Sequence, residues 1–118
     1  MRSNYACKLF AVLSLTIYST HSFAAIDGKN LYQLADDYKE FSTKHKMSST
    51  SAGTFIGYVT GIATILNIQG KICISGDVST GKVVDSVQNY IQDNPQFKSI
   101  SEGSIVVMLA LSETYKCK

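Results

Sequence analysis

The sequence predicts a small all-α domain, built like a four-helix bundle and closed by one disulfide. Apolar residues recur at helical spacing in four segments, and polar, turn-rich stretches separate those segments. Two cysteines remain once an N-terminal export signal is set aside. With 118 residues, the chain has room for a single domain.

Residues 1–24 have the three parts of a secretory signal peptide. Arg2 and Lys8 precede an apolar run at residues 9–18, and small residues stand at positions −3 and −1 of a cleavage after Ala24. The run is shorter than the ~20 residues that cross a bilayer. We therefore expect residues 25–118 to form one helical domain in an oxidising compartment, the bacterial periplasm.

The net charge of +2 belongs to the whole chain, because Arg2 and Lys8 leave with the signal and no acidic residue does. The remaining domain is then neutral. A neutral domain lacks the surplus of clustered cations by which proteins bind nucleic acid, so no nucleic-acid partner is expected.

The cysteines predict one disulfide. Cys7 leaves with the signal, and Cys73 and Cys117 remain as an even pair in an exported protein. Their bond would close a loop of about 45 residues and stabilise the fold by about 4 kcal/mol. A reactive thiol is the alternative, but it needs an activating cation or histidine nearby, and the sequence shows none.

The first helix is expected from about Lys29 to Phe41. Its apolar residues share one face and its charged residues the other, and Asn30 with Gln33 resembles a capping pair. The two faces are Leu31, Leu34, Tyr38 and Phe41 against Asp36, Asp37, Lys39 and Glu40. The polar stretch 42–51 predicts a loop, in which His45 is a solvated residue rather than a catalyst.

The second helix is expected over Ala52–Ile68. Gly53, Gly57 and Gly61 recur at every fourth residue and form one smooth stripe. Each glycine costs up to about 1 kcal/mol of helix propensity, which predicts close approach of another backbone, within the chain or across a dimer. A membrane-associated hairpin is the alternative, but the truly apolar part, 55–66, is too short to span a bilayer.

The rest of the chain predicts two more helices. After a connector at 69–79, Ser79 or Thr80 starts a helix that stops by Asn94, because Pro95 disfavours helix at the residue before it. A polar connector, Gln92–Glu102, follows, and Ser101 is expected to cap the last helix. Its segment Ile105–Leu111 is apolar all round, which predicts central burial, although the β-branched residues also fit a strand.

The sequence carries no constellation of catalytic or ligand-binding residues. With His45 as the single histidine after the signal, no histidine pair can hold a metal, and no CxxC, HExxH, GxSxG or phosphate-binding glycine loop occurs. We therefore expect no catalytic residue, no cofactor and no metal. These absences favour a binding protein or chaperone over an enzyme with an unfamiliar site.

The order of several short motifs resembles the Rap/Tai family of immunity proteins. They are Gly53-Thr-Phe-Ile-Gly-Tyr-Val-Thr-Gly-Ile62, Ile72-Cys73, Val78-Ser-Thr-Gly-Lys-Val-Val84, Tyr90-Ile91, Asn94-Pro95 and the late Cys117. The resemblance implies a periplasmic, disulfide-bonded helical protein, commonly a homodimer. It implies binding to a peptidoglycan amidase injected by a type VI secretion system, and occlusion of that amidase's active site.

The connector before the last helix is the predicted effector-binding surface, because it is polar and braced by Pro95 and carries one aromatic residue without a helix face to join. The predicted contact residues are Asp93, Asn94, Gln96, Phe97, Lys98 and Glu102. The alternative is an ordinary loop whose Phe97 packs back into the core. A small periplasmic acid-stress chaperone is the rival function, although nine acids and one histidine offer little for a pH switch.

Overall fold

The computed structural model describes residues 25–44 and 49–118, and within these ranges it is all-α with no strand. Its elements are α2 (Gly28–Lys44), α3 (Ser49–Ile68), α4 (Thr80–Asp93), the 3-10 helix η2 (Pro95–Ser99) and α5 (Gly103–Thr114). The predicted fold class is confirmed, and no strand replaces the last helix. The signal segment and His45 lie outside the described residues.

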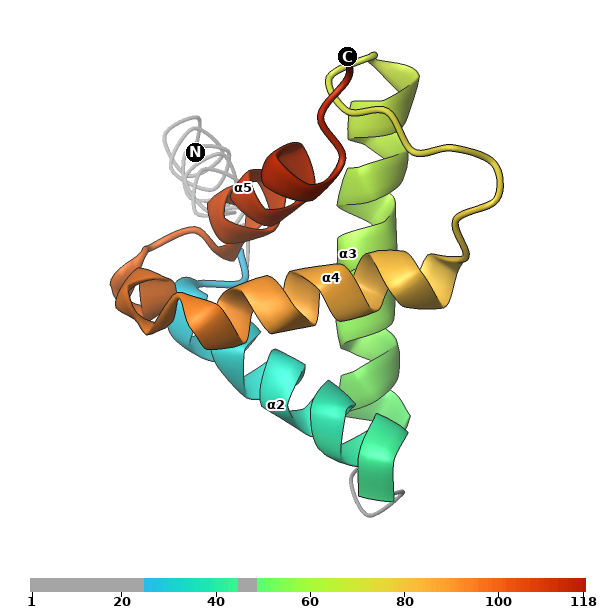
Figure 1. The fold of residues 1–118 in the computed structure, drawn as a ribbon. Coiled ribbons are helices and arrows are strands. Elements are labelled where there is room, and N and C mark those ends of the chain that lie inside the picture. The colour runs from blue at the N-terminus through green and yellow to red at the C-terminus, as the bar shows by residue number, and fades with distance from the viewer. Residues whose placement is uncertain (1–24, 45–48) are drawn as a thin grey trace, which may run out of the picture.

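The four α-helices surround one core, although α3 runs steeply across α4 rather than alongside it (Figure 1). The most extensive pairings are α2 with α3 and α4 with α5. Apolar side chains from all four helices and from the connector after α3 meet in the centre. The largest fully buried ones are Phe55, Leu31, Ile72, Ile91, Leu111, Val59, Val84, Val87, Val106 and Val107.

Two helix starts show how local residues set the boundaries. The carboxylate of Asp27 accepts a hydrogen bond from Asn30 N at 2.8 Å, so Asp27 caps α2 and the predicted Asn30–Gln33 capping pair is wrong. Ser79 caps α4 as predicted, because its Oγ accepts from Lys82 N at 3.3 Å. The helix ends at Asp93, two residues before Pro95, also as predicted.

Asp37 departs from the predicted solvated face of α2. Its side chain is 9% exposed, and its Oδ1 accepts a hydrogen bond from Gln33 Nε2 at 3.0 Å. A buried carboxylate needs such a donor. The spacing of charged residues along the helix did not indicate that Asp37 would be buried.

The last helix differs most from its prediction. It begins at Gly103 with Glu102 at the N-cap and no side-chain capping bond, so the predicted cap Ser101 is wrong. Central burial is also wrong, because Ile105, Met108 and Leu109 are exposed while the opposite face is fully buried. α5 lies at the edge of the fold, with α2, α3 and α4 on one side only.

A hydrogen bond between side chains joins α2 to α4. The Tyr38 hydroxyl donates to Asp85 Oδ1 at 2.7 Å, and the Tyr38 ring packs on Phe55 with 5.3 Å between centroids. Burial and the adjacent Asp85 carboxylate raise the pKa of Tyr38 to about 12. At neutral pH Tyr38 is therefore protonated in the folded domain, and its hydroxyl can donate to Asp85.

Replacing Tyr38 with phenylalanine should cost about 1 kcal/mol of stability at pH 7, the usual contribution of one such hydrogen bond. In the unfolded chain the phenol ionises near pH 10, and in the fold near 12. The stabilisation by neutral Tyr38 is thus complete below pH 10 and lost as pH rises to about 12. Urea unfolding between pH 7 and 12 should show a shallower alkaline loss in Tyr38→Phe; identical pH profiles would contradict this.

Candidate partner-binding surface

The predicted binding residues lie on and beside η2, which the structure forms inside the connector between α4 and α5. Asp93, Gln96, Lys98 and Glu102 are exposed, whereas Asn94 and Phe97 are partly buried. The structure therefore brings the predicted residues onto one connector. It divides them into four that face solvent and two that hold the connector to the domain.

Phe97 is an anchor of the connector. Its ring stacks on Tyr90 of α4, with 6.3 Å between centroids and 13° between planes, and it packs against the hydrophobic core. The structure therefore shows the alternative interpretation, in which Phe97 packs back against the core. Phe97 is therefore not the projecting aromatic that the sequence suggested.

Asn94 fixes the start of the connector through three hydrogen bonds. Its Nδ2 donates to the carbonyl oxygen of Tyr90 at 2.8 Å, and its own carbonyl oxygen accepts from the Tyr32 hydroxyl. Its Oδ1 accepts from Gln96 Nε2 at 3.1 Å. Asn94 thus links α2, α4 and η2. Its polar side-chain atoms are used in these bonds, so few of them are available to bind a partner.

Two glycines that the sequence did not single out hold the other end of the connector. Gly28 N donates to Ile100 O at 2.8 Å, and Gly103 N donates to Ile26 O at 2.7 Å. A Cβ on Gly28 would lie 2.7 Å from Ile100 O and 2.8 Å from Lys98 O, closer than real Cβ atoms come. Both glycines are isolated in the sequence, so no repeat or motif marked them.

The glycine stripe of α3 behaves differently. A Cβ added to Gly53, Gly57 or Gly61 would meet no atom of the described residues within 4 Å, and all three are exposed. Close helix packing within the chain is therefore ruled out for the described part of the fold, and the dimer alternative remains. Ile65 and Ile68, near the C-terminal end of α3, are also exposed.

α3 could also cross a membrane on length and composition alone, over Thr50–Ile68. In this fold one of its faces, with Phe55 and Val59, packs in the core. A core helix passes the same test of length and composition, so the finding by itself adds little to the membrane alternative.

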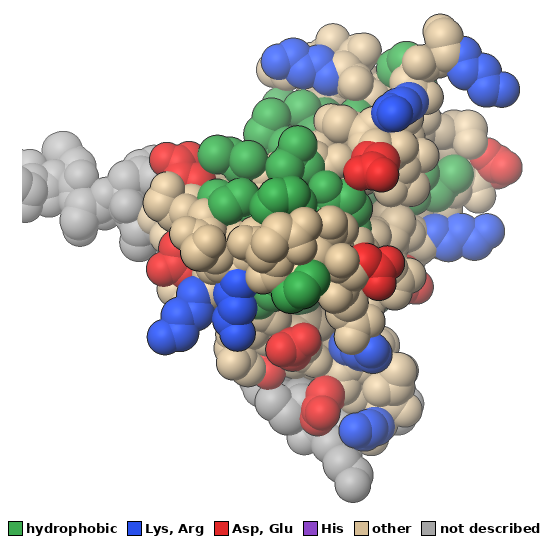
Figure 2. Space-filling view, turned by 60° about the vertical axis from the view of Figure 1, so that its left-hand side comes forward, with side chains coloured by type: hydrophobic (Ala, Val, Ile, Leu, Met, Phe, Trp, Pro, Cys, Tyr) green, Lys and Arg blue, Asp and Glu red, His purple; other side chains and the backbone are tan. Residues whose placement is uncertain are grey.

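The exposed apolar residues of α5 form the second unusual surface. Ile105, Met108 and Leu109 lie at i, i+3 and i+4 and so share one face of the helix. Figure 2 shows hydrophobic side chains gathered into one patch on this side of the molecule, with acidic side chains beside it. Such a patch is typical of a protein-binding surface.

The described residues contain no group of three or more His, Cys, Asp or Glu side chains that could hold a metal ion. One cavity of about 230 Å³ lies between the C-terminal half of α3 and the start of α4, lined in part by Thr64, Ile68 and Val83. None of its lining residues belongs to the connector between α4 and α5.

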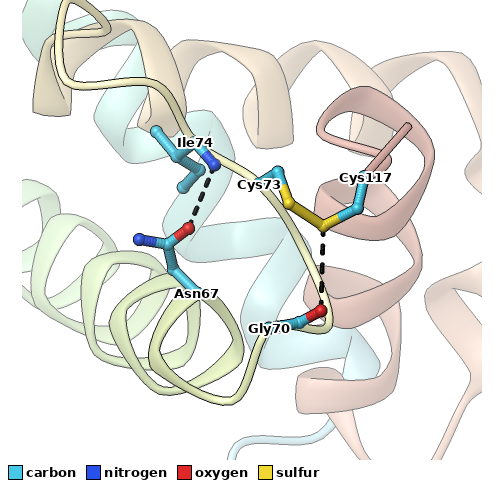
Figure 3. Close-up of a disulfide and its surroundings, with 5 residues drawn as sticks. All are labelled: Asn67, Gly70, Cys73, Ile74 and Cys117. Atoms are coloured by element: carbon cyan, nitrogen blue, oxygen red, sulfur yellow. Dashed lines mark hydrogen bonds between the residues drawn. A yellow bond between two sulfur atoms is a disulfide. The ribbon is translucent and has the colours of Figure 1, made fainter.

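Cys73 and Cys117 form the predicted disulfide, with their Cα atoms 4.9 Å apart (Figure 3). Asn67 Oδ1 accepts a hydrogen bond from Ile74 N at 3.0 Å and so holds the connector segment that carries Cys73. The Cys117 sulfur lies 3.7 Å from Gly70 O, a contact only, because a disulfide sulfur has no proton to donate. The bond ties the chain after α5 to the connector after α3.

Comparison with protein-family models gives one match, to the Rap1a immunity proteins, over residues 27–117. Searches of curated proteins and of solved structures gave no significant match. The matched range covers every helix described above, from the first turn of α2 to Cys117. Immunity proteins bind and inhibit a partner effector protein. The chain therefore belongs to the Rap1a family of immunity proteins.

Proposed function

We propose that this protein binds a peptidoglycan amidase effector of the type VI secretion system in the periplasm and blocks its active-site cleft. The observation that carries the proposal is the family match over residues 27–117. The braced connector with its exposed polar side chains supports it, because a segment already held in place loses less conformational entropy on binding than a free one. The signal-like segment 1–24 supports the compartment.

The test uses residues 25–118 and the effector amidase that they capture from a panel of candidate type VI amidases. Equimolar protein should abolish hydrolysis of purified peptidoglycan by that amidase, and the two should co-elute in size-exclusion chromatography. A triple variant, Asp93→Lys, Gln96→Ala and Lys98→Glu, should weaken the complex, since all three side chains face solvent and none fills the core. Suppression of acid-induced aggregation without amidase binding would instead favour the chaperone function.

We also propose that the domain is a homodimer that pairs through the glycine stripe of α3. The stripe is exposed and a Cβ there would meet no atom of the described residues, and α3 (Ser49–Ile68) contains no charged residue that would repel a second copy. Gly-x-x-x-Gly spacing lets two helices approach closely. Recovery of the protein only with membranes would contradict a soluble dimer.

Replacing Gly57 and Gly61 with alanine should have two opposite effects. It should stabilise the isolated helix by about 1 kcal/mol per residue, because the new methyl groups meet no described atom of the chain. It should also weaken the dimer at least about tenfold in sedimentation equilibrium, because the helices are pushed apart. Gly76→Ala, equally free of contacts but off the helix, is the control. Equal dimer affinity in the stripe variant and the control would exclude this seam.

A further inference from the structure

We propose that the exposed face of α5, made by Ile105, Met108 and Leu109, is the apolar centre of the effector-binding surface. Its occupant is an apolar segment of the effector flanked by lysine or arginine side chains. This inference rests on the function proposed above and adds the part of the surface that the connector does not supply.

The α5 face is exposed to solvent although its three side chains are apolar. Ile105, Met108 and Leu109 keep 45%, 40% and 42% of their surface exposed, whereas Val107 and Leu111 on the opposite side are fully buried. Exposing several large apolar side chains to water at one place on a helix is unfavourable in free energy. A partner that covers them recovers that free energy, and methionine adapts readily to the shape of an incoming side chain.

The face is continuous with the connector. Glu102 is the last residue of the connector and the N-cap of α5, one turn before Ile105. Protein interfaces combine an apolar centre with a polar rim, and a few central anchors supply most of the affinity. The solvent-facing side chain of Glu102 would form part of that rim, with the α5 face as the centre.

The charges on α5 identify the partner. Glu102 and Glu113 stand at the two ends of the apolar face, roughly 16 Å apart along the helix. If two copies paired antiparallel through this face about a twofold axis, Glu102 of each copy would meet Glu113 of the other. Like charges brought together in this way oppose association. A different protein with cations at this spacing fits the face, whereas the uncharged α3 fits a second copy.

The experiment compares two double variants of residues 25–118 in binding to the amidase captured from that panel. Ile105→Ser with Leu109→Ser alters the α5 face, and Ile65→Ser with Ile68→Ser removes matched apolar surface from α3. The α5 variant should bind the amidase about 100-fold more weakly by calorimetry, with unchanged mass in solution. The α3 variant lies beside the proposed dimer seam and should bind the amidase with wild-type affinity per protomer whether or not the dimer persists. A third variant, Glu102→Lys with Glu113→Lys, should lose about tenfold while removing no apolar contact.

The outcomes separate the two proposals. If the wild-type domain does not bind the amidase, the proposed function fails and this inference fails with it. If the wild type binds and the α5 and charge variants bind equally well, the inference alone is overturned. If the α5 variant instead halves the mass in solution, the face is the seam between two copies and the inference is again overturned. Circular dichroism of each variant shows whether the fold is intact, and the charge variant tests the inference if the serine variant does not fold.

Discussion

Replacing Cys73 with serine is expected to lower the free energy of unfolding by about 4 kcal/mol in oxidising buffer. The bond joins residues 44 positions apart, so it restricts a long stretch of the unfolded chain that contains α4, η2 and α5. A domain of this size has a total stability of about 5–10 kcal/mol, so the loss is a large share of it. Urea unfolding of the mature domain measures the effect.

Two controls separate the bond from the side chain. Wild-type protein in a reducing buffer should unfold at the same urea concentration as Cys73→Ser, and Cys73→Ser with Cys117→Ser should be no less stable than the single variant. The backbone bond from Cys73 N to Tyr115 O, 2.9 Å long, involves no sulfur and should persist in all of them. Equal midpoints for oxidised and reduced wild type would show that the bond does not stabilise the domain.

Replacing Gly103 with alanine is expected to cost about 3 kcal/mol. The added Cβ would lie 2.8 Å from Ile26 O, 3.1 Å from Asp27 O and 3.1 Å from Leu31 Cβ. Two of these atoms are backbone and cannot rotate away, so α5 must shift from the start of α2. The hydrogen bond from Gly103 N to Ile26 O would be strained by the same shift.

Gly81→Ala is the matched control, because Gly81 also lies in the first turn of a helix and its Cβ would only reach 4.0 Å from Ser79 Oγ. That variant should be as stable as the wild type or slightly more so. Thermal unfolding monitored by circular dichroism compares the two. A similar melting temperature for Gly103→Ala and Gly81→Ala would mean that α2 and α5 can separate without cost.

The sequence predicted those parts of the fold that depend on local chemistry. Apolar spacing located all four helices, Ser79 and Pro95 set the ends of α4, and the count of cysteines after the signal predicted the Cys73–Cys117 bond. These features follow from neighbouring residues or from covalent chemistry. They do not depend on how the helices are arranged in space.

The errors concern the arrangement of helices. An apolar run such as 105–111 shows that a helix has apolar faces, but not how many neighbours it will have, and α5 has them on one side only. The glycine spacing of α3 drew attention to residues with free space around them, while the glycines under close contact, Gly28 and Gly103, were isolated in the sequence. Phe97 likewise lies on no predicted helix face, yet its ring stacks on that of Tyr90 in α4.

If the connector binds the effector as proposed, the way it is held determines how its specificity can change. The Tyr32 hydroxyl bonds to the carbonyl oxygen of Asn94, Gly28 N bonds to that of Ile100, and Gly28 also abuts that of Lys98. All three contacts are made to main-chain atoms, which every amino acid presents alike. The side chain of Lys98 can therefore be exchanged without loss of these contacts, and exchanging Gln96 or Ser99 removes one exposed side-chain hydrogen bond each. A population that meets a new toxin could adapt this segment by point mutation while the scaffold continues to fold.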